Sequence, residues 1–255
     1  MSTNEIYAVI LALAAALTAG LIGAFALMKR MTLAADAISH IALPGLGLAI
    51  LVKIDPLLGG ATTLLLGTIL IWHLEKRTGI ATETMIGVVF SASLALGALI
   101  TPDEKIIEAI FGGFSPITFP SFIIGLLAAA AILVFIVKYK DRLIINLFSQ
   151  DLGTATGISA ATLNLFYLIA FSATIVISLQ FLGASLAGSL VIIPAATARR
   201  LTSRFPSFIT LSSALSVVAV GAGLIIASAY NLSLGPTVIS ISALLFALSL
   251  FKTNG

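Results

Sequence analysis

The sequence contains no cysteine and few charged residues, and both shortages exclude classes of function. Without cysteine, the chain has no disulfide, no thiolate metal site and no cysteine nucleophile. Any metal contact therefore uses nitrogen or oxygen ligands. Charged residues make up 9% of the 255 residues, against about 25% in an ordinary soluble domain. So few charges do not cover a water-exposed surface, whereas 60% hydrophobic residues suit a surface that faces lipid.

The sequence also lacks a phosphate-binding loop of the G-x-x-x-x-G-K-[ST] type. If ATP drives this protein, another chain must hydrolyse it, and we expect no enzymatic activity from this one. The first apolar run, 6–28, is longer than the core of about 7–15 residues found in signal peptides, and no Lys or Arg precedes it. We therefore expect a retained spanning helix whose N-terminus lies outside the cytosol.

Apolar runs close to the length that crosses a bilayer, about 20 residues, recur along the whole chain. We predict an all-α, polytopic transmembrane helical bundle that forms a single transmembrane domain, 1–255, with no soluble domain. The seventh predicted span is the shortest. The nine predicted spans are 6–28, 33–53, 57–74, 84–101, 121–138, 160–181, 184–198, 207–229 and 233–251.

The basic residues are distributed unevenly about these spans. With the N-terminus outside, eleven of the thirteen Lys and Arg residues lie in or beside cytosolic segments, and only Lys53 and Lys105 lie outside. The positive-inside rule predicts this asymmetry, and an odd number of spans is needed to produce it. Membrane topology thus explains the isoelectric point near 9.3, and we expect no nucleic-acid partner.

The second predicted span carries the sharpest candidate site. Asp36 and His40 are four residues apart, so a helix places them on one face, where a carboxylate and an imidazole can bind one divalent cation. Pro44 has no N–H, which leaves the carbonyl of His40 without its helical partner. Gly45 allows a bend and a close helix contact. The alternative is that Asp36 caps the helix and His40 lies at the cytosolic interface.

A proline also interrupts the seventh predicted span. Pro194 frees the carbonyl of Leu190, and the small residues Ala184 and Gly188 permit close helix contacts. A broken helix lined with small residues suits the wall of a pathway, and an ordinary packed helix is the alternative. The longest cytosolic segment, 139–159, mixes charged with apolar residues. It is either a docking site for a cytosolic partner or a connector that lies on the lipid headgroups.

Four stretches of the chain resemble segments of the membrane permeases of zinc-, manganese- and iron-type ABC importers, in the same order. The second span, AADAISHIALPGLGLAI, resembles their D-A-L-S-H-A-x-L-P-G segment. The stretch ETMIGVVFSASLALGALI resembles their fourth helix. SQDLGTATGIS resembles their cytoplasmic coupling segment, and LAGSLVIIPAATARRL resembles their late proline-bearing helix. Together the matches cover most of the chain.

This resemblance implies a permease for zinc, manganese or ferrous iron ions that acts as a dimer, expected to be a homodimer, in the plasma membrane. It implies cytosolic ABC ATPase subunits and an extracytoplasmic metal-binding protein as partners, and a transported ion in place of a permanent cofactor. Asp36 and His40 match positions where metal contacts are expected. The resemblance places ATPase coupling at Gln150, Asp151, Leu152, Gly153, Ala155 and Gly157, and a pathway or kink role at Pro44, Gly45 and Pro194.

Two other function classes stay open. One is a permease for a metal chelate, a siderophore or cobalamin, whose members usually have longer chains and ten spans. The other is a secondary metal transporter that needs no ATPase. That class is expected to carry a coupling carboxylate in mid-membrane, whereas Asp36 lies near a helix end.

Overall fold

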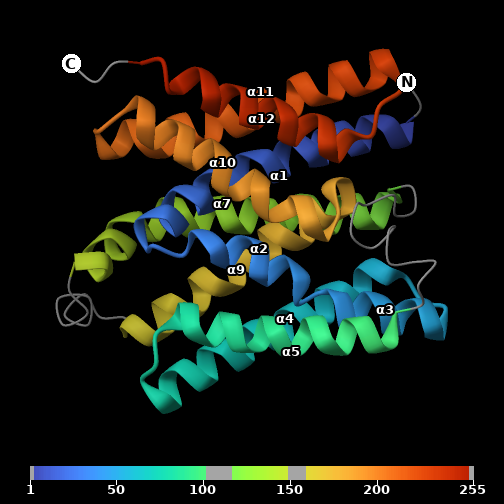
Figure 1. Cartoon of the computed structure of the whole chain (residues 1–255), viewed down its shortest axis with the longest axis vertical. Coiled ribbons are helices and arrows are strands. Elements are labelled where there is room, and N and C mark those ends of the chain that lie inside the picture. Colours follow the sequence, from blue (N-terminus) through green and yellow to red (C-terminus); the bar gives the residue numbers. More distant parts are fainter. Residues whose placement is uncertain (1–2, 102–116, 149–158, 253–255) are drawn as a thin grey trace.

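The computed structural model describes residues 3–101, 117–148 and 159–252, and within these ranges the chain forms ten α-helices and no strand. Figure 1 shows them side by side in one bundle, which confirms the predicted all-α fold. The helices are α1 (Thr3–Met28), α2 (Thr32–His40), α3 (Leu43–Val52), α4 (Pro56–Thr78), α5 (Thr82–Ile100), α7 (Phe119–Phe148), α9 (Ala160–Leu182), α10 (Ala184–Leu201), α11 (Phe205–Tyr230) and α12 (Leu234–Ser249).

Seven of the described helical segments are long and apolar enough to cross a membrane, with α2 and α3 counted together as Leu33–Val52. Helix α12 is apolar but shorter, and α10, the seventh predicted span, is not among the seven. Each of the nine predicted spans still coincides with a helix or with the α2–α3 pair. The structure is therefore consistent with the predicted order of spans.

Capping residues fix where several helices begin and end. The carboxylate of Asp55 accepts a hydrogen bond from the N–H of Leu57 at 2.9 Å and so caps α4. The hydroxyl of Ser159 caps α9 by accepting a hydrogen bond from the N–H of Thr162 at 3.2 Å. Helix α4 is capped at its C-terminus by Gly79, whose φ of 71° lies in the left-handed region that glycine adopts without strain.

Helix α1 runs through the middle of the bundle and packs against α7, α9, α10 and α11. Many of its buried residues are small, including Ala15, Ala16 and Ala19. Where α1 meets α11, the hydroxyl of Ser212 donates a hydrogen bond to the carbonyl of Gly20 at 2.6 Å. Small side chains and such hydrogen bonds drive helix association in lipid, because burial of apolar surface gains little there.

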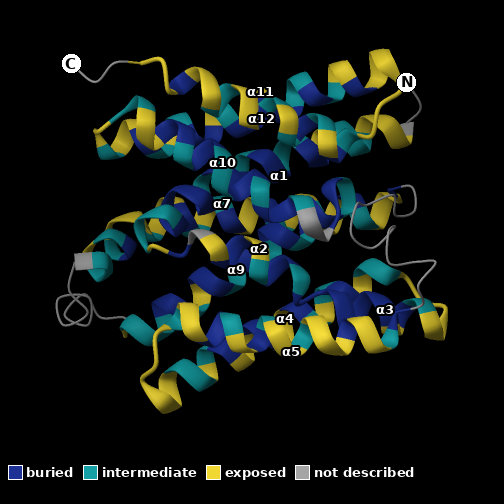
Figure 2. Cartoon of the chain, viewed as in Figure 1, coloured by how far each residue is buried: buried dark blue, intermediate teal, exposed yellow. Residues whose placement is uncertain are grey.

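Large apolar side chains are exposed on the outer faces of the bundle (Figure 2). They include Leu66 on α4, Leu99 on α5, Val134 on α7 and Ile225 on α11. In water, so much exposed apolar surface would mark an interaction site. On a chain of membrane-spanning helices, these faces meet the acyl chains of the lipids.

Basic side chains gather at one end of the bundle, which we call the basic end. Helices α1, α4, α7 and α10 finish there, and they or the residues that follow them carry Lys29, Lys76, Arg142 and Arg199. Lys53 lies at the opposite end, between α3 and α4, and Lys105 lies outside the described residues. The positive-inside rule predicts that the basic end faces the cytosol.

Candidate functional site

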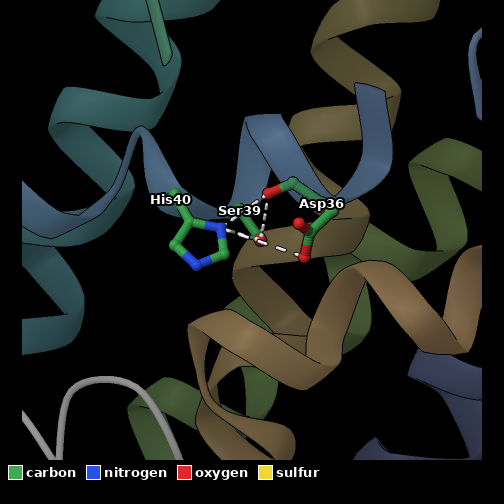
Figure 3. Close-up of polar contacts among 3 residues, drawn as sticks. All are labelled: Asp36, Ser39 and His40. Atoms are coloured by element: carbon green, nitrogen blue, oxygen red, sulfur yellow. Dashed lines mark hydrogen bonds and ion pairs between the residues drawn. The ribbon is translucent and has the colours of Figure 1, made fainter. Parts of the chain in front are cut away.

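Asp36 and His40 both lie on α2, with their side chains on the same side of the helix (Figure 3). The Nδ1 atom of His40 is 3.9 Å from the Oδ1 atom of Asp36. The side chain of Asp36 is 53% exposed and that of His40 is 17% exposed. The carboxylate and the imidazole therefore share a face, as the spacing predicts, and the carboxylate is the more open of the two.

The alternative role of Asp36 as a helix cap does not fit the structure. Helix α2 begins at Thr32, and Met31 occupies the cap position. Asp36 lies inside the helix, beyond the free N–H groups of the first turn that a cap would accept from. Its carboxylate is therefore not needed to start the helix, and the cost of keeping a carboxylate in a membrane span points to another role.

A backbone hydrogen bond fixes the His40 ring. Its Nδ1 atom is 2.8 Å from the carbonyl oxygen of Asp36. A carbonyl only accepts, so Nδ1 carries the hydrogen and donates it, and a neutral ring then keeps its lone pair on Nε2. Figure 3 shows Nε2 pointing away from Asp36. Metal-binding histidines are commonly held in this way, with one ring nitrogen on a carbonyl and the other free for the metal.

The pair does not form a two-residue chelate in this arrangement. The Asp36 carboxylate lies near Nδ1, which is already engaged, whereas the free lone pair of His40 is on Nε2. Within the described ranges, no three His, Asp or Glu side chains come together in a way that could hold a metal ion. A metal ion at Nε2 would therefore take its other ligands from water, from a rearranged Asp36 or from another chain.

The predicted second span is broken directly after His40. The N–H groups of Ile41 and Ala42 donate to carbonyls three residues back, at 3.0 and 3.3 Å, and α3 then begins at Leu43. Pro44 therefore lies in the first turn of α3, where its missing N–H costs little, and not inside a single bent helix. The carbonyl of His40 still lacks an N–H at residue 44, as the sequence predicts.

Two glycines bring neighbouring helices close to this segment. A Cβ atom on Gly45 of α3 would overlap the carbonyl oxygen of Gly59 on α4, so both glycines are needed for the contact. On α10, a Cβ atom at Gly188 would lie 2.7 Å from the Cα atom of Asp36. The close contacts predicted for Gly45 and Gly188 are thus present, while a pathway role for Gly45 stays a prediction.

Pro194 is buried within α10, which continues through it to Leu201. One turn earlier, the carbonyl of Val191 lies against Gly23 of α1. In the single chain, this part of α10 packs closely against α1, and its role in a pathway stays a prediction. The residues predicted to couple to an ATPase, Gln150 to Gly157, lie outside the described residues.

The structure adds one residue to the site that the sequence did not single out. The ring of Phe90 on α5 meets the His40 ring edge-on, with centroids 5.7 Å apart and planes at 76°. Phe90 belongs to the ETMIGVVFSASLALGALI stretch, which resembles the fourth helix of the metal permeases, but the resemblance assigned no role to this residue. The His40 ring therefore has an apolar neighbour, Phe90, and a polar one, the exposed carboxylate of Asp36.

The chain matches the family model described as the ABC 3 transport family over residues 3–253. It is 29% identical over 240 residues to the high-affinity zinc uptake system membrane protein ZnuB of Buchnera aphidicola, covering 91% of this chain and 92% of that protein. It is 30% identical over 248 residues to the manganese import system permease protein ScaB of Streptococcus gordonii, covering 96% of this chain and 89% of that protein.

A solved structure has the same fold. PsaBC from Streptococcus pneumoniae, in complex with Fab, includes a chain that superposes on this one with a TM-score of 0.82 at 28% sequence identity. The match covers 99% of this chain and 93% of that chain. The similarity therefore extends over the whole bundle.

Proposed function

The chain belongs to the ABC 3 transport family, and from that premise we propose that it is the permease of an ATP-driven importer of divalent transition metal ions. It is a multi-pass protein of the cell membrane. Zinc and manganese are the first candidates, because relatives named for each match more than nine-tenths of the chain. Ferrous iron accepts the same imidazole and carboxylate ligands.

The observation that carries this proposal is the hydrogen bond from His40 to the carbonyl of Asp36. It leaves Nε2 with a free lone pair on a ring that cannot easily turn. A neutral imidazole is a good ligand for all three ions, and the exposed carboxylate of Asp36 would supply an oxygen ligand after it rearranges toward Nε2. Two side chains with water bind more weakly than the four ligands of a structural site, and weak binding lets the ion leave.

A second copy of the chain would complete this site. Asp36 is half exposed on a helix that belongs to a membrane span, where an uncovered carboxylate is costly. A twofold dimer that covers this face would remove Asp36 from lipid and bring two Asp36–His40 pairs near one axis. This supports the homodimer that the family resemblance implies.

The remaining partners follow from the two ends of the bundle. Helix α7 ends and α9 begins at the basic end. In the sequence, residues 150–157 lie between these helices, and to them we assign the docking site for the cytosolic ATPase subunits. An ATPase must be separate, because the sequence has no phosphate-binding loop. The extracytoplasmic metal-binding protein would meet the opposite end, where α1 begins and α11 joins α12.

The experiment is to purify the permease with the proteins that accompany it and reconstitute the complex in vesicles. We expect an ATPase subunit to copurify, and uptake of zinc or manganese to require hydrolysable ATP on the side of the basic end. Uptake that continues without ATP would support a secondary transporter. Uptake of a metal chelate in preference to the free ion would support the chelate class. Either result would contradict the proposal.

A further inference from the structure

Three helices are joined by side chains at the basic end, away from the Asp36–His40 site. Lys29 follows the last residue of α1, Glu75 lies in the last turn of α4, and Asn164 lies in the second turn of α9. The ammonium of Lys29 donates a hydrogen bond to Oδ1 of Asn164. The Nδ2 group of Asn164 donates to both carboxylate oxygens of Glu75, at 2.9 and 3.1 Å. We call this arrangement the Asn164 bridge.

The chemistry of the bridge requires an amide at its centre. An ammonium only donates and a carboxylate only accepts, so the middle group must accept on one side and donate on the other. Asn164 does both, and it is 7% exposed. A leucine of similar size would do neither. An aspartate would still accept from Lys29 but would place a second carboxylate against Glu75.

The bridge holds a charge that is only partly hydrated. Burial lowers the pKa of Lys29 to about 8, and the nearby charge of Glu75 offsets part of that effect. The ammonium also lies 4.6 Å from the centre of the Tyr167 ring on α9. Separation of α1 from α9 would return water to this charge. The favourable contacts of the Lys29 ammonium in the joined state are therefore offset by the cost of removing its water. Such a contact can be made and broken within a working cycle.

The bridge connects the two parts of the chain that the proposed function assigns to ATP and to metal. Helix α9 begins three residues after Gly157, the last residue of the proposed ATPase-docking segment. Lys29 lies three residues before α2, the helix that carries Asp36 and His40. A shift of the first turns of α9 would therefore act, through Asn164, on the start of α2.

A second contact joins α4 to α9, and a cavity lies beside both helices. The indole N–H of Trp72 donates to the carbonyl of Ala161 at 2.9 Å. A cavity of about 600 Å³ adjoins the bridge, lined by Asn164, Thr82 and Asn146 among others. The first turns of α9 are thus tied to α4 and α1 by side chains that themselves line this open space.

We propose that Asn164 is a positioning residue that passes movement of the ATPase-docking segment to the metal-binding helix α2. The proposal rests on the proposed function, since it needs an ATPase at residues 150–157 and a metal at α2. It assigns no contact with the ion to Asn164. Loss of the bridge should therefore uncouple ATP hydrolysis from transport, leaving both the ATPase and the metal site intact.

The test measures ATP hydrolysis and metal uptake in the same reconstituted vesicles, with zinc and manganese as probes. For Asn164→Leu we expect the number of ions transported per ATP to fall about tenfold, within the usual range of an energetic coupling between sites. Copurification of the ATPase should not change. The matched control is Asn146→Leu, the same substitution in the same cavity but outside the bridge. It should keep the wild-type ratio.

A second pair of variants covers the case in which Asn164→Leu does not assemble. Asn164→Asp is isosteric and polar, and it should also lower the ratio because it repels Glu75. Adding Glu75→Gln to Asn164→Asp keeps the net charge of the wild type and restores a donor to the bridge, so the ratio should recover. A purely structural residue would lose assembly without changing the ratio.

The outcomes of this test separate the inference from the proposed function. A wild-type ratio in Asn164→Leu or in Asn164→Asp, or no recovery in the double variant, would overturn the role of Asn164 and leave the proposed function standing. Absence of ATP-dependent metal uptake in the wild-type complex would overturn the proposed function itself.

Discussion

Gly188 of α10 lies directly against the backbone of Asp36 on α2. A Cβ atom at residue 188 would be 2.7 Å from both the Cα and N atoms of Asp36, closer than side chains pack. The position of the α2 helix, and with it the direction of the Asp36 carboxylate, therefore depends on the absence of a side chain at residue 188. Helix packing in membranes relies on such small residues.

This contact predicts that Gly188→Ala displaces α2 and lowers the free energy of unfolding by about 1–3 kcal/mol, the usual cost of overpacking. Metal uptake should fall as well, because Asp36 moves. The measurement is thermal unfolding in detergent together with uptake in vesicles. The matched control is Gly221→Ala on α11, where a Cβ atom meets nothing within 4 Å. Equal stability and uptake in the two variants would contradict the contact.

The orientation of the bundle can be tested with single cysteines, since the native chain has none. Lys53 and Thr78 are both exposed and lie at opposite ends of the bundle, Thr78 at the basic end. In intact cells, Lys53→Cys should react with a membrane-impermeant maleimide, and Thr78→Cys should react only after permeabilisation. The reverse pattern would place the basic end outside and would move the ATPase to the other face.

The lowered pKa of Lys29 predicts how its contribution to stability changes with pH. Lys29 follows the span Asn4–Met28, and burial lowers its pKa from 10.5 to about 8 despite Glu75. Between these two values, the unfolded chain holds a proton on Lys29 that the folded chain has released. Unfolding then takes up a proton, so stability rises with pH in this window. Below it, both states are protonated and the contribution of Lys29 is constant.

Lys29→Met removes this titration and keeps much of the aliphatic side chain. The difference in thermal midpoint, wild type minus Lys29→Met, should increase as pH rises from about 8 to 10. Other titrating groups are common to both proteins and cancel in the difference. A difference that stays flat or decreases over this range would show that the Lys29 ammonium is hydrated in the folded protein.

Hydropathy and charge predicted most of the fold, because in a membrane each span is encoded by a local run of residues. The Asp36–His40 relationship was equally predictable, since a spacing of four residues fixes two positions on one helix. The break at Ile41 was not, because a helix that bends at Pro44 and a helix that stops before it have the same apolar pattern. Local spacing also says nothing about which ring nitrogen of His40 is hydrogen-bonded.

The Asn164 bridge and the contact of Gly188 with Asp36 needed the structure. Asn164 is separated from Lys29 by 135 residues and from Glu75 by 89. Contacts at such separations depend on how the helices pack, and a single sequence does not encode them locally. Glu75 sits beside Lys76 and Arg77, so in the sequence it reads as one more charge at the end of a span.

The two histidines of the chain provide the most direct test of the central claim, that His40 and Asp36 contact the transported metal. His73 lies on α4 and is exposed, so His73→Ala is a matched control for His40→Ala. The measurement is ATP-dependent uptake of zinc and manganese by vesicles that contain each reconstituted variant, with assembly verified by copurification of the ATPase. We predict that His40→Ala and Asp36→Asn abolish uptake, while His73→Ala retains it. Wild-type uptake in both His40→Ala and Asp36→Asn would contradict the claim and leave the pair a structural role only.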